Sequence, residues 1–293
     1  MIQETIGHIN VEGGKLGYRL CLPEDIDCRN NPTLCLMHGG PGGVHDGQYA
    51  MLKELAAERP VLFYDQLGAG LSACDVPVEL MTMERHVAEF EALVTELGIN
   101  EFILLGHSWG GSVAIDYTLK NPDTVIGLIL SSPLISSKRW CEDTRRLLGS
   151  LSAEYVEILT KAEETGVKSD EASEAERLFY RNFVYRVDEY PPDVLETVKK
   201  SNRTIYNTMW GPSEFSCQGA LKNYDRFPDL HKITCPTMLI AGEYDEAPPS
   251  TMEEAAKLMP NAKVVTVPDA AHMTARENPT FYKAALTEFF EQF

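Results

Sequence analysis

A serine flanked by glycines is the residue of this chain best placed for covalent chemistry. Ser108 lies at the centre of GHSWG, which has the pattern G-x-S-x-G. The apolar residues 102–105 before it indicate a buried strand, and the residues after it indicate a helix. So sharp a turn needs small neighbours, which Gly106 and Gly110 provide. We therefore predict that Ser108 is a nucleophile, with a helix N-terminus behind it that favours developing negative charge.

A serine hydroxyl becomes a strong nucleophile only when a base takes its proton and a third group orients that base. Asp245 follows the apolar segment 237–241, and His272 follows the next predicted strand, 263–267. Because the carboxyl ends of parallel strands lie at one edge of a sheet, we expect Ser108, Asp245 and His272 to converge there. The order Ser, Asp, His along the chain is the order of an α/β-hydrolase triad.

Other titratable residues compete for these roles. Asp269, three residues before His272, is the alternative orienting acid, but Asp245 has the position at the end of a strand. His107 adjoins the nucleophile and is expected to point away from it. His38 closes a strand and is expected to hydrogen-bond locally.

Acyl transfer also needs hydrogen-bond donors for the tetrahedral oxyanion. The main-chain N–H of Trp109, directly after the nucleophile, is one candidate. The glycine-rich turn HGGPG at 38–42 supplies the other, and Gly40 is the natural donor because Pro41 has no N–H. A phosphate cradle is disfavoured because G-K-[ST] is missing and the net charge is negative. No spacing typical of metal ligands occurs, so we predict no cofactor.

The elements around these residues alternate between strand and helix, which predicts an α/β fold: an α/β-hydrolase with a mostly parallel central sheet and helices on both faces. Residues 5–22 read as a hairpin. The pattern changes over 133–232, where we expect a helical cap inserted into a core formed by 1–132 and 233–293. Helices are expected near 48–58, 82–97, 138–148, 152–165, 171–187 and 192–209. Ser250 and Glu253 are expected to form a capping box.

Composition excludes several classes of function. The 293 residues carry 44 acidic against 26 basic side chains, a formal charge of -18, which disfavours nucleic acid and anionic membranes as partners. The N-terminal sequence shows no signal peptide, and no apolar stretch is long enough to span a membrane. The seven cysteines lack C-x-x-C spacing and indicate reduced thiols in a cytoplasmic protein.

Six motifs give a more specific indication. HGGPGG, YDQLGAGLS, GHSWGG, GPSEF, GEYDE and AAHMT occur in this order. Together the chain resembles the prolyl aminopeptidase (proline iminopeptidase) family, and within it the branch of the tricorn-interacting aminopeptidase and the L-amino acid amidases. The resemblance implies that Ser108, Asp245 and His272 form the triad and that Gly40 and Trp109 supply the oxyanion donors. Strictly proline-directed bacterial enzymes typically have the motifs DQRGCGRS and GGSWGS, whereas this chain has DQLGAGLS and GHSWGG. The resemblance therefore does not imply strict proline specificity.

The same resemblance implies that Glu214 and Glu246 hold the free amino group of the substrate. Carboxylates are the available counter-charge for an ammonium group, and Glu246 adjoins Asp245. The alternative for Glu214 is a salt bridge of the cap or a solvated surface position. Aromatic side chains of the cap are expected to form core, with a few lining a slot for an apolar residue: Phe179, Tyr180, Phe183, Tyr185, Tyr206, Trp210 and Phe215.

The leading hypothesis is a serine hydrolase that releases the N-terminal residue, proline or another small or apolar one, from short peptides. An amidase acting on amino-acid amides or on an aminoacylated small molecule is the nearest alternative, with the same mechanism and a different leaving group. A carboxylesterase would have no use for paired glutamates. A non-catalytic ligand receptor would have no need of a complete triad. The oligomeric state is not predicted.

Overall fold

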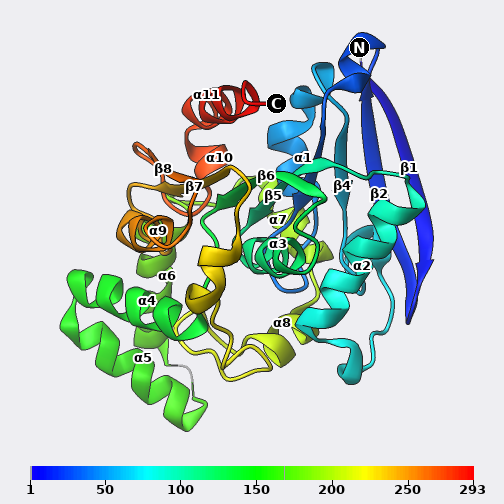
Figure 1. The fold of residues 1–293 in the computed structure, drawn as a ribbon. Helices are drawn as coiled ribbons and strands as arrows, with labels where there is room; N and C mark the ends of the chain where they lie inside the picture. The colour runs from blue at the N-terminus through cyan, green and yellow to red at the C-terminus, as the bar shows by residue number, and fades with distance from the viewer. Residues whose placement is uncertain (1, 168) are drawn as a thin grey trace.

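The computed structural model describes residues 2–167 and 169–293, and these residues form an eight-stranded sheet with the order β1-β2-β4-β3-β5-β6-β7-β8 (Figure 1). The antiparallel hairpin of β1 (Ile2–Val11) and β2 (Gly14–Pro23) occupies one edge. β2 pairs antiparallel with β4, and the remaining pairs are parallel. These parallel strands are β3 (Thr33–Met37), β4 (Val61–Tyr64), β5 (Phe102–His107), β6 (Val125–Ser131), β7 (Thr237–Gly242) and β8 (Ala262–Val267).

The central strands are apolar on both faces because helices cover both. In β3, Cys35 and Met37 pack into the same buried cluster as side chains of α2 (Met83–Glu96), α3 (Trp109–Lys120) and α9 (Pro249–Ala256). Leu34 and Leu36 point to the other face, against α1 (Asp46–Leu52) and α11 (Pro279–Phe290). This alternation follows from the two-residue period of a strand. The predicted fold class is confirmed.

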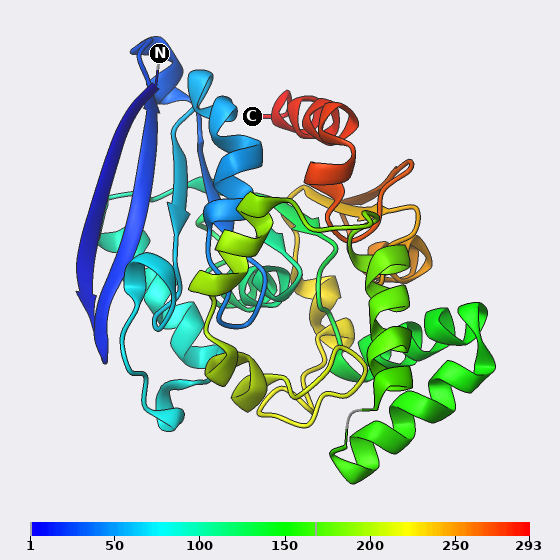
Figure 2. The same ribbon diagram turned by 180° about the vertical axis from the view of Figure 1, so that it is seen from behind.

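Between β6 and β7 the chain leaves the sheet and forms helices, of which those over 137–165 lie furthest from it, at the lower left of Figure 1 and the lower right of Figure 2. They are α4 (Ser137–Leu151), α5 (Ala153–Thr165), α6 (Asp170–Phe179), α7 (Pro192–Lys200) and α8 (Arg203–Met209). Phe179, Phe183 and Phe215 pack with apolar side chains of α4 and α5 into a small core of their own. Most of the aromatics predicted in this segment are therefore structural.

Polar contacts tie these helices to the sheet domain. Arg226 donates from Nε and Nη2 to the two carboxylate oxygens of Asp116 on α3, at 2.6 and 2.9 Å. The Tyr224 hydroxyl donates to the same carboxylate at 3.1 Å. On another side, Lys200 of α7 reaches Asp46 of α1 at 2.9 Å.

Several predicted boundaries are wrong. The segment 48–58, predicted as one helix, is α1 followed by a 3-10 turn, Lys53–Ala57. The segment 171–187, also predicted as one helix, is α6 followed by a π-turn, Tyr180–Val184. The helix expected over 192–209 breaks between α7 and α8, because the side chain of Asn202 accepts the main-chain N–H groups that begin α8. Ser250 and Glu253 form no capping box, since α9 already begins at Pro249.

Short elements complete the chain: 3-10 turns at Asp27–Asn30, Gly70–Ser72, Val78–Leu80 and Phe227–Lys232, and the short helix α10 (Thr274–Glu277). Within the described residues, no helix combines the length and apolar character needed to cross a membrane.

Candidate active site

Ser108 occupies a strained turn between β5 and α3. Its φ is 54° and its ψ is −122°, in a region that costs a non-glycine residue about 1–3 kcal/mol. A Cβ on Gly106 would lie 2.3 Å from the Gly110 carbonyl oxygen, and one on Gly110 would lie 2.3 Å from that of Met37. Both positions therefore require glycine. The Ser108 N–H donates to the carbonyl of Ser131 at 2.9 Å, which fixes the turn against β6.

The carboxylate of Asp245 accepts hydrogen bonds from three groups besides the histidine. Its Oδ1 lies 2.9 Å from Nδ1 of His272 and also accepts the Ala247 N–H. Its Oδ2 accepts the Ser132 hydroxyl at 2.5 Å and the Gly242 N–H at 3.0 Å. Asp245 and His272 are both buried, at 1% and 6% exposure. The histidine ring is thus held in one orientation by a carboxylate that is itself fixed.

The rival acid lies elsewhere. Asp269 is exposed, and its main-chain N–H donates to Glu243 in the loop after β7. Its carboxylate makes no contact with His272 among the described residues. The structure therefore pairs His272 with Asp245.

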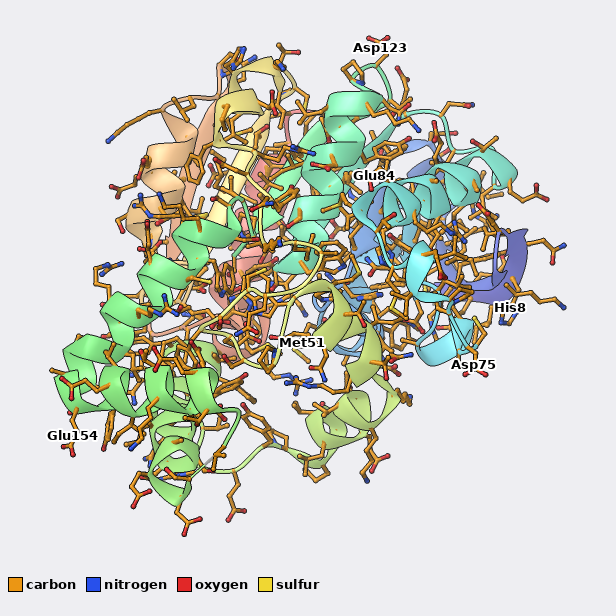
Figure 3. All side chains as sticks on the ribbon, turned by 90° about the horizontal axis from the view of Figure 1, so that it is seen from below. His8, Met51, Asp75, Glu84, Asp123 and Glu154 are labelled. Carbon is orange, nitrogen blue, oxygen red and sulfur yellow. The ribbon has the colours of Figure 1, made fainter. Side chains whose placement is uncertain are left out.

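A cavity of about 360 Å³ brings most of the predicted residues together. Ser108, His272, Gly40, Glu214 and Glu246 all line it. Its volume lies in the range of small-molecule sites, roughly 300–1000 Å³. Met51 also lines the cavity, and Figure 3 shows it toward the middle of the molecule.

Trp109 is not among the residues that line the cavity, and its main-chain N–H is the group expected to serve the site. Its indole is buried, and Nε1 donates to Oε1 of Gln66 at 2.9 Å. As the first residue of α3, Trp109 has an N–H without an acceptor within the helix. That N–H and the Gly40 N–H are the two donors expected to serve an oxyanion.

The two glutamates reach the cavity from different segments. Glu246 is 2% exposed, its Oε1 lies 3.7 Å from Nε2 of His272, and its Oε2 has no hydrogen-bond donor in the described part of the chain. Glu214 accepts a hydrogen bond from the Tyr206 hydroxyl. Burial raises the pKa of both carboxyl groups, most strongly that of Glu246, where the charges of Glu214 and Asp245 add to the effect. Tyr206 is the one residue of the predicted aromatic set that lines the cavity.

His272 has the opposite electrostatic environment. Burial alone would lower its pKa, but the carboxylates of Asp245, Glu246 and Glu214 raise it to about 9. A pKa of about 9 favours the protonated imidazole at neutral pH. A cation bound between the glutamates would offset their negative charge and so lower the pKa of His272. This favours the neutral imidazole, the form that can act as a base.

The expectation that His107 points away from the site is wrong. Its ring lies 4.8 Å from the ring of His272, centroid to centroid, and it lines the cavity. Burial and the neighbouring His272 lower the pKa of His107 to about 3, so it stays neutral. His107 therefore presents an uncharged ring to His272. The pattern G-x-S-x-G does not specify this side chain, because only its glycines and serine are constrained.

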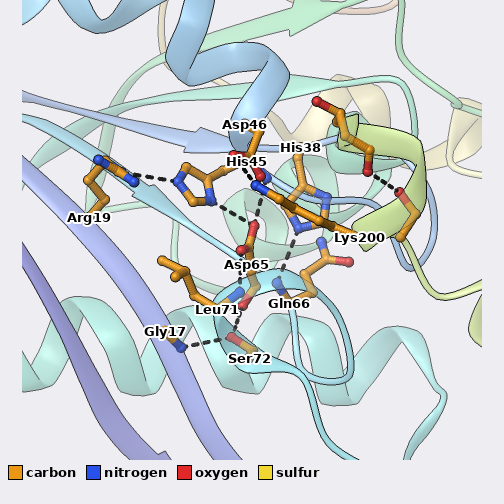
Figure 4. Close-up of polar contacts among 12 residues, drawn as sticks. Gly17, Arg19, His38, His45, Asp46, Asp65, Gln66, Leu71, Ser72 and Lys200 are labelled. Atoms are coloured by element: carbon orange, nitrogen blue, oxygen red, sulfur yellow. Dashed lines mark hydrogen bonds and ion pairs between the residues drawn. The ribbon is translucent and has the colours of Figure 1, made fainter. Parts of the chain in front are cut away.

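A polar cluster beneath the glycine-rich turn was not foreseen (Figure 4). Nδ1 of His38 lies 2.8 Å from the Gly39 carbonyl, as the local hydrogen bond predicted, and Nε2 accepts the Gln66 N–H at 3.1 Å. His45 donates its N–H to Asp65 Oδ1, which also lies 2.8 Å from His45 Nδ1. The sequence feature that marks this cluster is the Asp65-Gln66 pair, which directly follows β4. The cluster fixes the turn that carries Gly40.

Comparisons with known proteins agree with this geometry. The model of the alpha/beta hydrolase fold family matches residues 32–279. The chain is 38% identical to a proline iminopeptidase of Heyndrickxia coagulans, covering 97% of this chain and 98% of the relative. It is 34% identical to a proline iminopeptidase of Saccharolobus solfataricus, covering 90% and 86%. The crystal structure of proline iminopeptidase from Mycobacterium smegmatis superposes with a TM-score of 0.89 at 30% identity, covering 98% of each chain.

These matches extend over nearly the whole chain, so they include both the sheet and the inserted helices. They confirm the resemblance inferred from the six motifs. The chain belongs to the proline iminopeptidase family of the α/β-hydrolase fold.

Proposed function

We propose that this protein is a serine aminopeptidase that releases the N-terminal residue, proline or another small or apolar one, from short peptides. One observation carries the proposal: Ser108 and the Asp245–His272 pair share a cavity with two carboxylates whose pKa is raised by burial. Buried carboxylates need a cation, and the substrate's α-ammonium group supplies one. The relatives, which bear the name proline iminopeptidase, support the same reading.

The reaction follows from the roles of these groups. His272 Nε2 takes the proton of Ser108 as the serine oxygen attacks the carbonyl carbon of the first residue. The N–H groups of Gly40 and Trp109 stabilise the resulting oxyanion. When the intermediate collapses, the scissile C–N bond breaks, and protonated His272 gives its proton to the departing amine. Water then attacks the acyl-enzyme with His272 again as base, which releases the free amino acid and restores the Ser108 hydroxyl.

Glu214 and Glu246 determine where the first residue lies. An ammonium group held between their side chains puts the carbonyl carbon of the same residue only two bonds away, within reach of Ser108. This requirement for a free amino terminus makes the enzyme an exopeptidase. A simple ester would not use either carboxylate, so esterase activity is expected to be secondary.

The helices between β6 and β7 serve as the cap in this proposal. We infer that residues 133–232 form a lid on a core made of 1–132 and 233–293, because Val184, Val198 and Tyr206 line the same cavity as Ser108. The lid limits the size of the substrate. A cytoplasmic location agrees with the seven unpaired cysteines.

Turnover of prolyl and alanyl anilides tests the activity. The wild-type protein should release aniline from both, and Ser108→Ala should retain the fold by circular dichroism while losing at least a thousandfold in kcat. An amidase with no use for peptides would cleave alaninamide and fail on alanyl-alanine. Absence of turnover with every free-amine substrate would overturn the proposal and favour a receptor.

A further inference from the structure

The cavity has polar atoms without partners beyond those that the reaction uses. Oε1 of Gln48, Oγ1 of Thr274 and Nε of Arg276 are buried and make no hydrogen bond within the described residues, and all three residues line the cavity. Leaving such an atom buried and unpaired costs about 1–3 kcal/mol. Unpaired polar atoms gathered at one cavity are a feature of a site that awaits a ligand.

The cavity is lined by charged side chains of both signs. Glu214 and Glu246 supply its acidic side chains, and Arg276 is the one lysine or arginine among its described lining residues. In a protein with a formal charge of -18, an arginine at this position is the local attraction for an anion. A cavity with carboxylates for a cation and a guanidinium for an anion matches a zwitterion.

Arg276 is held in position by one ion pair and keeps donors free for another. It lies on α10, which begins two residues after His272. Its Nη2 donates to Oδ2 of Asp193 on α7 at 2.7 Å, and the Arg276 side chain is 13% exposed. A guanidinium has five N–H donors in a fixed plane, so this one contact leaves capacity to bind a carboxylate as well.

Gln48 and Thr274 add main-chain recognition. The amide nitrogen of Gln48 donates to the Met37 carbonyl at 3.0 Å, which leaves Oε1 as an acceptor for an N–H group. Thr274 is 1% exposed, and its hydroxyl can donate to a carbonyl or carboxylate oxygen. A peptide residue offers both kinds of partner.

We propose that Arg276, Thr274 and Gln48 form a leaving-group subsite that binds the residue after the scissile bond, with Arg276 pairing with its free carboxylate. This inference rests on the aminopeptidase activity proposed above and narrows its substrates to dipeptides, whose two charged termini fit the two charged parts of the cavity. Longer peptides lose the ion pair because their carboxylate lies further along the chain.

The test compares alanyl-alanine with alanyl-alaninamide, which differ only in the terminal carboxylate. Wild-type kcat/KM should be at least about tenfold higher for the free acid, the ratio expected from a hydrogen bond to a charged group. Arg276→Met should remove this preference mainly through KM, and Arg276→Lys should keep part of it. Arg276→Met should lower kcat/KM less for alanyl anilide, whose leaving group has no carboxylate, than for alanyl-alanine.

Asp193→Asn serves as the matched control because it breaks the ion pair on α7 and keeps the guanidinium. Its preference for the free acid should persist, whereas a purely structural Arg276 would make Asp193→Asn and Arg276→Met behave alike on all substrates. Equal rates for the two dipeptides in wild type would overturn the subsite while leaving the aminopeptidase intact. Cleavage of the anilide with neither dipeptide cleaved would instead overturn the peptidase activity itself.

Discussion

Oε1 of Glu246 lies 3.7 Å from Nε2 of His272, the nitrogen proposed to take the proton of Ser108. The Glu246 side chain thus lies beside both the proposed base and the proposed position of the substrate ammonium. Because the Glu246 carboxyl and the His272 imidazole lie this close, protonation of one changes the pKa of the other. Through this contact, binding of the substrate's amino group is expected to change the pKa of His272.

The first prediction is a pH profile. The pKa of His272 is raised to about 9 by the neighbouring carboxylates, and only the neutral imidazole can accept a proton. With a simple ester that has no amine, kcat/KM should therefore rise as pH increases through about 9. Glu246→Gln removes one of these charges, so the midpoint should move to lower pH. Each unit by which the pKa falls raises the neutral fraction at pH 7 about tenfold.

A free-amine substrate gives the internal control for this profile. Its ammonium offsets the glutamate charges, so kcat, which reports the enzyme–substrate complex, should have a midpoint well below that of the ester reaction. Identical midpoints for the ester with wild type and with Glu246→Gln would mean that Glu246 does not act on His272.

The second prediction separates the two candidate acids. Asp245→Asn keeps the shape of the side chain but removes the charge that orients His272, and should lower kcat by about 10³–10⁴-fold. Asp269→Asn, at an exposed position in the loop before the histidine, should leave kcat within a factor of two or so. Steady-state kinetics of both variants on prolyl anilide decides the matter, and a large loss in Asp269→Asn would reverse the assignment.

The third prediction concerns how the inserted helices are anchored. Asp116 is largely buried and accepts hydrogen bonds from both Arg226 and Tyr224, so Asp116→Asn should lower the free energy of unfolding by about 1.5–3 kcal/mol. Lys120→Met, on the same helix as Asp116, breaks an exposed ion pair with Glu91 of α2 and should cost under about 1 kcal/mol. Urea denaturation midpoints measure both. Equal small effects would show that the Asp116 contacts contribute little.

The sequence predicts the elements whose chemistry is local. Ser108 needs glycines two residues away on each side, and Asp245 and His272 follow consecutive strands of a parallel sheet, so topology alone brings them to one edge. Contacts between segments that are distant in the sequence have no such sequence pattern. The placement of Arg276 against Asp193 depends on how α7 packs on α10, and no motif records it.

Helix boundaries show the same limit. Asn202 divides the segment predicted as one helix, because its side chain caps α8 while its N–H donates to the Gly42 carbonyl. That second contact joins the helices between β6 and β7 to the turn that carries Gly40, over a separation of 160 residues. Propensity over a short window cannot anticipate a break that a distant loop imposes.

The last prediction is that the enzyme requires a protonated amino terminus. Burial raises the pKa of both Glu214 and Glu246, and the charge of Glu214 further disfavours ionisation of Glu246. A bound ammonium relieves their repulsion and forms charge-assisted hydrogen bonds, each worth about 1.5–3 kcal/mol. Acetylating the amine removes that charge and adds bulk beside the carboxylates. Alanyl anilide should therefore be cleaved at least about a hundredfold faster, in kcat/KM, than acetyl-alanyl anilide.

Variants assign this selectivity to the two carboxylates. Glu214→Gln and Glu246→Gln should each lower kcat/KM for alanyl anilide by roughly 10- to 150-fold, as expected for one lost hydrogen bond to a charged group. Glu253→Gln, an equivalent change at an exposed position on α9, controls for the loss of one negative charge from the protein and should have no such effect. Because neither glutamate holds an acetylated substrate, its slow cleavage should not slow further in Glu214→Gln. If wild type cleaves both anilides at the same rate, the ammonium plays no part in binding, and the two glutamates must have a purely structural role.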